Sequence, residues 1–153
     1  MQEVIKTADG REIVCYPLTH AQKRIWYIEK LYPGTSLYNI GGPSRIRGEV
    51  DFRLLEESIQ LFIRKNDGIR LHFVEQDGEV SQYVSEYRIF KVDFADFSSC
   101  PDPEKEFDTW IHTEIRRPYQ LENSDLYYFA LFKIDEQNAG LFVRFHHIIA
   151  DGW

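Results

Sequence analysis

The spacing of hydrophobic residues divides the chain into amphipathic helices and short strands. Hydrophobic residues recur every three to four positions, the period of a helix, in residues 20–32, 52–65 and 103–117. Each segment follows a residue that favours a helix start, namely Thr19, Asp51 and Asp102. We therefore predict three helices.

Local signals refine two of these helices. Thr19 and Gln22 have the spacing of a capping box, and the buried stripe of the first helix is expected to be Ala21, Ile25, Ile28 and Tyr32. The second helix is expected to close at residues 66–68, with Gly68 in the left-handed conformation.

Runs of β-branched and aromatic residues between the helices predict strands. These runs cover residues 13–16, 38–46, 69–73, 80–84, 90–94, 127–134 and 141–147. Residues 76–79 and 135–140 are predicted turns, and Gly41-Gly42-Pro43 predicts a bulge or a sheet edge. Residues 1–12, with a turn at Asp9-Gly10, are expected to be a leader of low order. Helices interleaved with mixed strands predict an α/β layered fold.

The composition indicates a globular domain. The 153 residues, 43% hydrophobic and 15% aromatic, suffice for one domain with its own core. The net charge of −7, without a basic stripe, argues against a nucleic-acid partner. No apolar run approaches the ~20 residues of a membrane span, and no signal peptide opens the chain. Cys15 and Cys100 form no disulfide framework, so we expect a cytoplasmic protein. From the charge and the short apolar runs, we expect it to bind neither nucleic acid nor membrane.

The end of the chain carries the residues most suited to chemistry, His146-His147-Ile148-Ile149-Ala150-Asp151-Gly152-Trp153. Side chains alternate across a strand, so His147 shares a face with Leu141, Val143 and Phe145, while His146 points the other way. Histidine titrates near neutral pH, so His147, with a carboxylate nearby, is a candidate general base.

Two other interpretations of these residues remain open. A histidine on an apolar face is often a hydrogen-bonded core residue, and Asp-Gly after a strand is often a turn. Histidine and aspartate are also metal ligands, but adjacent histidines on a strand diverge, and no Cys-x-x-Cys or His-Glu-x-x-His accompanies them. We therefore expect no metal site.

The His-His-x-x-x-Asp-Gly pattern resembles the active-site signature of condensation domains of nonribosomal peptide synthetases, members of the chloramphenicol acetyltransferase-like superfamily. Two upstream segments extend the resemblance. Ala21-Gln22-x-Arg24-x-Trp26 resembles the first family motif, with Thr19 in the place of its serine. Residues 65–73 resemble the second motif, Arg-His-Glu-x-Leu-Arg-Thr-x-Phe, through Asp67, Ile69, Arg70 and Phe73, and they depart from it at Lys65, Asn66 and Leu71.

The three motifs cover about residues 13–153 and imply the N-terminal subdomain of a condensation domain, truncated after the last motif. The resemblance implies a two-layer sandwich in which helices pack on a mixed sheet, as one half of a pseudodimer. It implies amide-bond formation between a donor thioester and an acceptor aminoacyl thioester. No cofactor is bound directly, since substrates arrive on the phosphopantetheine arms of carrier domains. Implied partners are the upstream and downstream carrier domains, a neighbouring adenylation domain and the missing C-terminal half.

The resemblance also assigns roles to residues. His147 faces the reactants, as a base or as a group that orients the amine, and His146 is structural. Asp151 fixes the loop and the His147 tautomer through an arginine contact, for which Arg70 is a candidate. Gly152 keeps space beside the reacting centre, and as a hypothesis its N–H meets a developing oxyanion.

Two alternative functions and several subtypes remain open. Trp153 after Asp-Gly resembles domains for L-configured donors or fatty-acyl starters, and epimerisation domains share the motif. Heterocyclisation domains replace the first histidines with Asp, so we do not expect that subtype. The alternatives are a non-catalytic docking module for a carrier domain and a trimeric stand-alone acyltransferase. Without a second half, we expect an exposed inter-half surface and little turnover from this chain alone.

Overall fold

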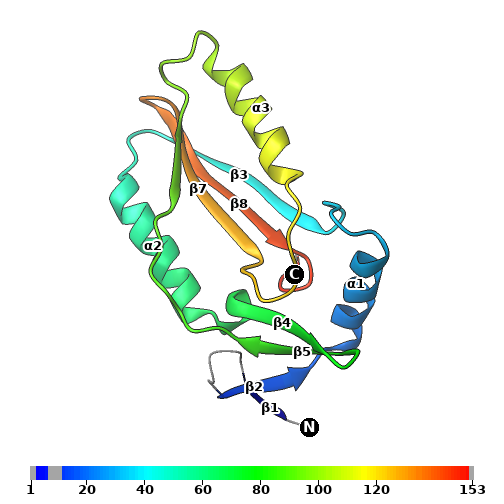
Figure 1. The fold of residues 1–153 in the computed structure, drawn as a ribbon. Coiled ribbons are helices and arrows are strands. Elements are labelled where there is room, and N and C mark those ends of the chain that lie inside the picture. Colours follow the sequence, from blue (N-terminus) through cyan, green and yellow to red (C-terminus); the bar gives the residue numbers. More distant parts are fainter. Residues whose placement is uncertain (1–2, 7–11, 152–153) are drawn as a thin grey trace.

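The computed structural model of the chain describes residues 3–6 and 12–151. Across these residues the elements are β1 (Glu3–Lys6), β2 (Glu12–Pro17), α1 (His20–Leu31), β3 (Asn39–Arg47), α2 (Phe52–Lys65), the 3₁₀ helix η1 (Asp67–Arg70), β4 (Leu71–Gln76), β5 (Glu79–Val84), β6 (Asp93–Asp96), α3 (Pro103–Ile115), β7 (Tyr127–Asp135) and β8 (Asn138–His146). In Figure 1 the upper sheet has the order β3-β8-β7-β6 and the lower sheet the order β1-β2-β5-β4. The predicted α/β architecture is confirmed.

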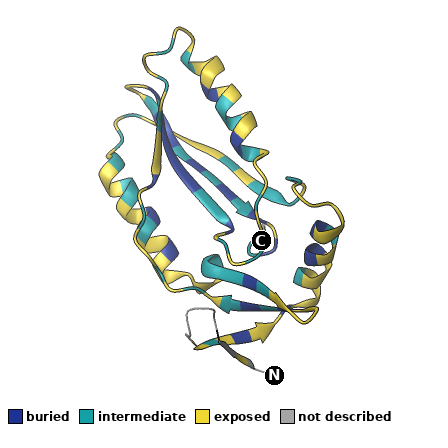
Figure 2. Ribbon diagram, viewed as in Figure 1, coloured by how far each residue is buried: buried dark blue, intermediate teal, exposed yellow. Residues whose placement is uncertain are grey.

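The upper sheet is mixed and has a helix on each face. Its strands pair antiparallel except β6 and β7, which are parallel. On one face, Phe107 of α3 packs with Ala130, Phe132 and Phe142 of the sheet. On the other face, α2 packs against β7 through the buried residues Ile59, Ile63, Phe129 and Leu131. Burial is therefore concentrated in the central strands β7 and β8 (Figure 2).

A separate core cluster joins the lower sheet to the upper one. It contains Ile25 and Trp26 of α1 and Phe73 and Val80 of the lower sheet, together with Leu18, Leu126 and Ile148. Leu126 directly precedes β7 and Ile148 follows β8. The start and the end of the central hairpin of the upper sheet are thus held by the core of the lower sheet.

The hairpin β4–β5 has the predicted turn. Asp77 and Gly78 both have positive φ, 52° and 81°, as a two-residue turn of type I′ requires. The other hairpin, β7–β8, is tighter than predicted, because residues 138–140 belong to β8 rather than to the turn. Asp135 explains this: its carboxylate accepts hydrogen bonds from Gln137 N and Asn138 Nδ2, both at 2.7 Å, and so closes the turn early.

The predicted capping box of α1 is confirmed, but its predicted buried stripe is wrong in part. Thr19 N donates to Gln22 Oε1 and Gln22 N donates to Thr19 Oγ1, at 2.9 and 3.2 Å. The buried residues of α1 are Ile25, Trp26 and Glu29, whereas Ala21 and Tyr32 are exposed. The Trp26 ring packs on the Phe73 ring, with centroids 6.0 Å apart, and this contact sets which face of α1 is buried.

Three further expectations differ from the structure. Within the predicted leader, Glu3–Lys6 forms β1 and pairs with β2; the predicted Asp9-Gly10 turn lies outside the described residues. Gly68 is not left-handed but belongs to η1, which begins with a hydrogen bond from Ile69 N to Asn66 O. The strand predicted at residues 90–94 is β6 at Asp93–Asp96, since Val92 N bonds to the Glu56 carboxylate of α2 instead.

Gly41-Gly42-Pro43 marks a sheet edge, one of the two predicted outcomes. These residues lie in β3, whose register with β8 is unbroken. Gly41 has φ of 136°, and a Cβ atom there would overlap the carbonyl oxygen of Val143. Only glycine fits this close approach of β3 to β8.

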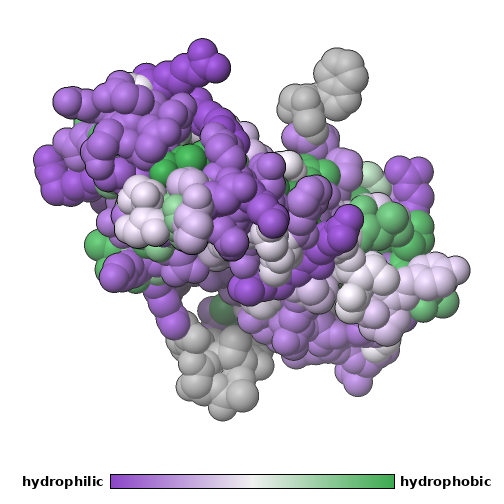
Figure 3. All heavy atoms as spheres, turned by 90° about the horizontal axis from the view of Figure 1, so that it is seen from above, coloured by the Kyte–Doolittle hydropathy of each residue, from purple (hydrophilic) through white to green (hydrophobic). Residues whose placement is uncertain are grey.

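The surface and the remaining polar groups add three observations. Figure 3, seen from above, shows mostly hydrophilic residues with hydrophobic ones in separate spots. No helix in the described part of the chain combines the length and apolar character needed to cross a membrane. Within residues 3–6 and 12–151, no group of three or more His, Cys, Asp or Glu side chains is placed to hold a metal ion.

Candidate functional site

The two adjacent histidines stand at the end of β8, beside the start of its neighbouring strands. His146 N donates to Leu126 O at 2.9 Å, just before β7, and His147 N donates to Tyr38 O at 2.8 Å, just before β3. The side chains alternate as predicted: His146 is 2% exposed, whereas His147 is exposed. The central strand therefore delivers one histidine to the interior and one to the surface.

The environment of His146 fixes it as a neutral, buried ring. Its Nδ1 accepts a hydrogen bond from Ile148 N at 3.3 Å, so the ring proton is on Nε2, which lies 3.4 Å from Glu29 Oε1. The rings of Tyr38 and Tyr119 lie on either flank, each with its centroid 6.0 Å away. Burial, together with a smaller effect of the neighbouring His147, lowers the pKa of His146 to about 4. Burial also raises the pKa of Glu29.

His147 has the opposite proton arrangement. Its Nδ1 lies 2.9 Å from the carbonyl oxygen of Ala150. A carbonyl can only accept a hydrogen bond, so the Nδ1 atom of a neutral His147 ring carries the proton and Nε2 keeps a free lone pair. Because the side chain is exposed, that lone pair can accept a proton from a reactant.

The loop after His147 is held by its own backbone and by the core. Ile149 N donates to His146 O at 3.1 Å, and the Ile148 side chain is buried in the cluster that joins the sheets. The Ile148 carbonyl accepts a hydrogen bond from Gln22 Nε2 of α1 at 3.3 Å. Asp151 is exposed and is the last residue described, so Gly152 lies outside the described residues.

Arg70 is the predicted supporting arginine, and its contacts lie near the end of α2. It forms an ion pair with Asp67 and donates to Arg64 O at 3.2 Å. It also lines a hollow of about 540 Å³ with His72 and Tyr127, in which His72 Nε2 lies 2.9 Å from Asp125 Oδ1. The predicted contact between Arg70 and Asp151 stays a prediction.

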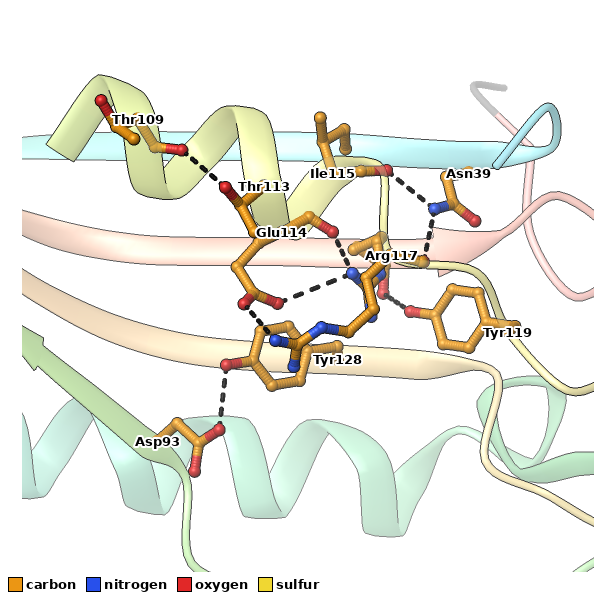
Figure 4. A network of polar contacts seen from close by, with 10 residues as sticks. Asn39, Asp93, Thr109, Thr113, Glu114, Ile115, Arg117, Tyr119 and Tyr128 are labelled. Carbon is orange, nitrogen blue, oxygen red and sulfur yellow. Dashed lines mark hydrogen bonds and ion pairs between the residues drawn. The ribbon is translucent and has the colours of Figure 1, made fainter. Parts of the chain in front are cut away.

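Sequence reasoning missed a buried ion pair between Arg144 and Glu114, which belongs to the polar network around Glu114 that Figure 4 shows. Arg144 lies two residues before His146 on the same face of β8 and is 3% exposed. Its guanidinium donates to Glu114 O and lies 3.7 Å from Glu114 Oε2 of α3. The guanidinium is also stacked over the rings of Tyr119 and Tyr128, with centroids at 4.7 and 5.2 Å.

The same network anchors the end of α3 to the strands that hold the histidines. Tyr119 donates its hydroxyl hydrogen to Arg144 O at 2.8 Å, and the edge of its ring meets His146. Asn39 of β3 donates to the carbonyls of Ile115 and Arg117, at 2.7 and 2.9 Å. The available signal was Arg144 itself, a charge that alternates onto the same strand face as Phe142.

Comparison with known proteins gives one consistent result. The family model described as "Condensation domain" matches residues 13–153. Surfactin synthase subunit 1 of Bacillus subtilis (strain 168) is 41% identical over 144 residues, which are 92% of this chain and 4% of that protein. A plipastatin synthase subunit from the same organism is 37% identical over 138 residues, 90% of this chain and 5% of that protein.

Solved structures agree with the sequence comparisons. The starter condensation domain of rhizomide synthetase RzmA superposes with a TM-score of 0.84 at 28% identity, covering 90% of this chain and 33% of that one. A variant of that domain was solved in complex with C8-CoA and Leu-SNAC. The chain thus spans about a third of these solved domains and a few per cent of the curated relatives.

Proposed function

This chain belongs to the condensation-domain family, and we propose that it supplies the histidine-bearing part of an enzyme that forms an amide bond between two carrier-bound substrates. The family was predicted from three motifs, and the family model matches the same residues, 13–153. Because the chain spans about a third of the solved domains, the proposed activity belongs to a complete domain. The chain alone is expected to show little or no turnover.

The observation that carries this proposal is the state of His147. Its Nδ1 lies against Ala150 O, its side chain is exposed, and Nε2 has no hydrogen-bond partner among the described residues. In the proposed reaction the acceptor amine attacks the carbonyl carbon of the donor thioester, and His147 Nε2 takes a proton from the attacking nitrogen. The C–N bond forms, the C–S bond breaks, and the proton passes to the leaving thiolate. A positioned base contributes about 10²–10⁴-fold to such a step.

His147 also orients the acceptor amine in this proposal. Holding two tethered reactants in a reactive geometry contributes more to rate than proton transfer alone. His146 takes no part in proton transfer in this proposal, because its ring is buried and both ring nitrogens have partners inside the protein. Asp151 fixes the loop through an arginine, with Arg70 as the candidate, and the Gly152 N–H stabilises the oxyanion of the tetrahedral intermediate.

We propose carrier domains as the partners, because both substrates are thioesters. They arrive on phosphopantetheine arms, loaded with the help of an adenylation domain, and the second half of the condensation domain completes the site. The donor is an acyl or aminoacyl group and the acceptor an aminoacyl group, the classes of C8-CoA and Leu-SNAC bound by the related starter domain. A cytoplasmic location is part of the same proposal.

Intact-mass detection of product between two loaded carrier domains tests this function. The assay compares the chain alone, a complete condensation domain whose N-terminal part is this chain, and the His147→Ala form of that domain. We expect product from the complete domain and its loss on substitution. Full product from the His147→Ala form would contradict the role of His147. Carrier binding without product from any form would instead favour the docking module, and a trimer with activity on its own would favour a stand-alone acyltransferase.

A further inference from the structure

Gln22 connects three parts of the molecule through one side-chain amide. Its Oε1 accepts hydrogen bonds from Thr19 N and Gln82 Nε2, at 2.9 and 3.0 Å. Its Nε2 donates to Gln82 Oε1 at 2.8 Å and to Ile148 O at 3.3 Å. A carboxamide has two acceptor and two donor positions, so the full capacity of Gln22 is used.

Three of these four bonds belong to the framework of the lower sheet and α1. The bond with Thr19 is the capping box, and the two bonds with Gln82 hold β5, in which Gln82 is 8% exposed. Gln82 also donates to Pro17 O at 3.2 Å, which fixes the end of β2. The paired amides of Gln22 and Gln82 are therefore held by the start of α1 and the end of β2.

The fourth bond reaches the loop that carries the candidate base. Ile148 directly follows His147, and its carbonyl lies between His147 and Ala150, whose oxygen engages the Nδ1 proton of His147. Of the other backbone bonds here, those from Ile148 N and Ile149 N end on His146, the last residue of β8, and His147 N donates to Tyr38 O before β3. Gln22 thus ties the backbone of this loop to a different element.

We propose that Gln22 is a positioning residue for His147: it holds the Ile148 carbonyl so that the Ala150 oxygen stays on Nδ1 and Nε2 points toward the reactants. This inference rests on the proposed function for its catalytic consequence. Its structural part, the effect of Gln22 on the His147 tautomer, is independent of any reaction.

Two substitutions of nearly identical shape separate this role from framework stability. In Gln22→Glu, a carboxylate still accepts from Thr19 N and Gln82 Nε2, but the bonds to Gln82 Oε1 and Ile148 O are lost. In Gln82→Glu, the bonds to Pro17 O and Gln22 Oε1 are lost, while Gln22 Nε2 can still donate to the introduced carboxylate and to Ile148 O. Because Gln82 is the more buried residue, its substitution is expected to lower the stability at least as much.

The first measurement is ¹⁵N NMR of the histidine rings in this chain. We expect the Nδ1-protonated tautomer of His147 in the unchanged chain and in Gln82→Glu, and a mixture of tautomers in Gln22→Glu. Gln22→Met, which lacks both the donor and the charge, is expected to behave like Gln22→Glu. If Gln22→Glu does not fold, Gln22→Met decides the test. An unchanged His147 tautomer in the folded Gln22 variants, or an equal change in Gln82→Glu, would overturn the proposal.

The second measurement is the rate of condensation in the complete domain. Gln22→Glu is expected to lower kcat about 10- to 100-fold with little change in KM, since a displaced catalytic group costs rate rather than binding. Gln82→Glu is expected to leave kcat within about threefold. If His147→Ala retains full activity, the proposed function fails while the NMR result still stands, so the two failures are distinguishable.

Discussion

His146 and His147 are neighbours with the same side chain, yet their surroundings give them opposite tautomers. A backbone N–H fixes the acceptor nitrogen of His146, and a backbone carbonyl fixes the donor nitrogen of His147. At the residue scale the division of roles therefore follows from which main-chain group each ring meets. Burial then leaves His147, the proposed base, at the surface and His146 in the interior.

This division predicts different stability effects for the two alanine substitutions. His146→Ala empties a buried site and removes the partner of Ile148 N–H and of Glu29, so it should lower the free energy of unfolding by about 2–3 kcal/mol. His147→Ala changes an exposed side chain and should alter it by less than about 0.5 kcal/mol. Urea unfolding of both variants measures the difference. Equal losses in the free energy of unfolding would contradict the prediction, because they would mean that both side chains contribute equally to stability.

The lowered pKa of His146 predicts how stability depends on pH. Its ordinary value is 6.5 and burial lowers it to about 4, so between these values the unfolded chain binds a proton that the folded chain does not. Stability should therefore fall as pH decreases through this window, and His146 alone should account for about 2 kcal/mol between pH 7 and pH 5. The raised pKa of Glu29 acts in the opposite direction.

Comparison with a variant that cannot titrate isolates this effect from that of the surface carboxylates. His146→Asn keeps a polar side chain, and the free energy of unfolding of both proteins is measured in urea at pH 7 and pH 5. The unchanged chain should lose more stability on acidification than the variant. Parallel pH profiles would contradict the assignment.

At the element scale, the ion pair between Arg144 of β8 and Glu114 of α3 joins a helix to the strand that delivers the histidines. Glu114→Ala leaves the buried Arg144 guanidinium without its carboxylate, so it should lower the free energy of unfolding by about 3–5 kcal/mol. Arg144→Ala should lower it by less, because Arg117 Nη2 still lies 3.1 Å from Glu114 Oε1. Replacing both residues with alanine removes both charges and should lower the free energy of unfolding by less than the sum of the two single losses. A double-mutant cycle in urea measures the coupling, and additive losses would argue against it.

The elements themselves show what local sequence determines. The caps at Thr19, Asp51 and Asp102 were predictable, because each accepts a hydrogen bond from a backbone N–H three residues later. The buried face of α1 was not predictable, because it depends on the packing of Trp26 against Phe73, a residue far along the chain. Tertiary contacts set the helix rotation, whereas neighbouring residues set the helix start.

In the candidate site, too, the features set by local sequence were predictable and those set by tertiary contacts were not. Strand alternation separated His146 from His147 correctly, because a two-residue period is a property of the strand alone. The partners Glu29, Gln22 and Ala150 were not identified as such, since their contacts depend on how α1 and the loop after β8 come together.

At the scale of the whole molecule, the two sheets share a core. Trp26 and Phe73 belong to α1 and the lower sheet, while Leu126 and Ile148 flank the central hairpin of the upper sheet. Each half would expose part of this cluster if it unfolded alone. We therefore expect the described fold to unfold as one cooperative unit.

Two tryptophans report separately on the two sheets and allow this to be tested. Trp26 is buried in the shared cluster, and Trp110 of α3 packs against Phe132 and Phe142 of the upper sheet. In a Trp153→Phe background, Trp26→Phe leaves Trp110 as the reporter and Trp110→Phe leaves Trp26. For each variant, the fluorescence midpoint in urea should coincide with the midpoint from far-ultraviolet circular dichroism.

Leu126→Ala supplies the decisive comparison, because it truncates the shared cluster at a residue outside both tryptophan-bearing helices. It should lower the free energy of unfolding by about 2–4 kcal/mol when read from either reporter, since both sheets depend on the contacts that this buried side chain makes. A shift seen by Trp26 alone would mean that the upper sheet persists when the lower one opens. In that case the loop after His147, whose Ile148 packs in the same cluster, would lose its support before the strands do.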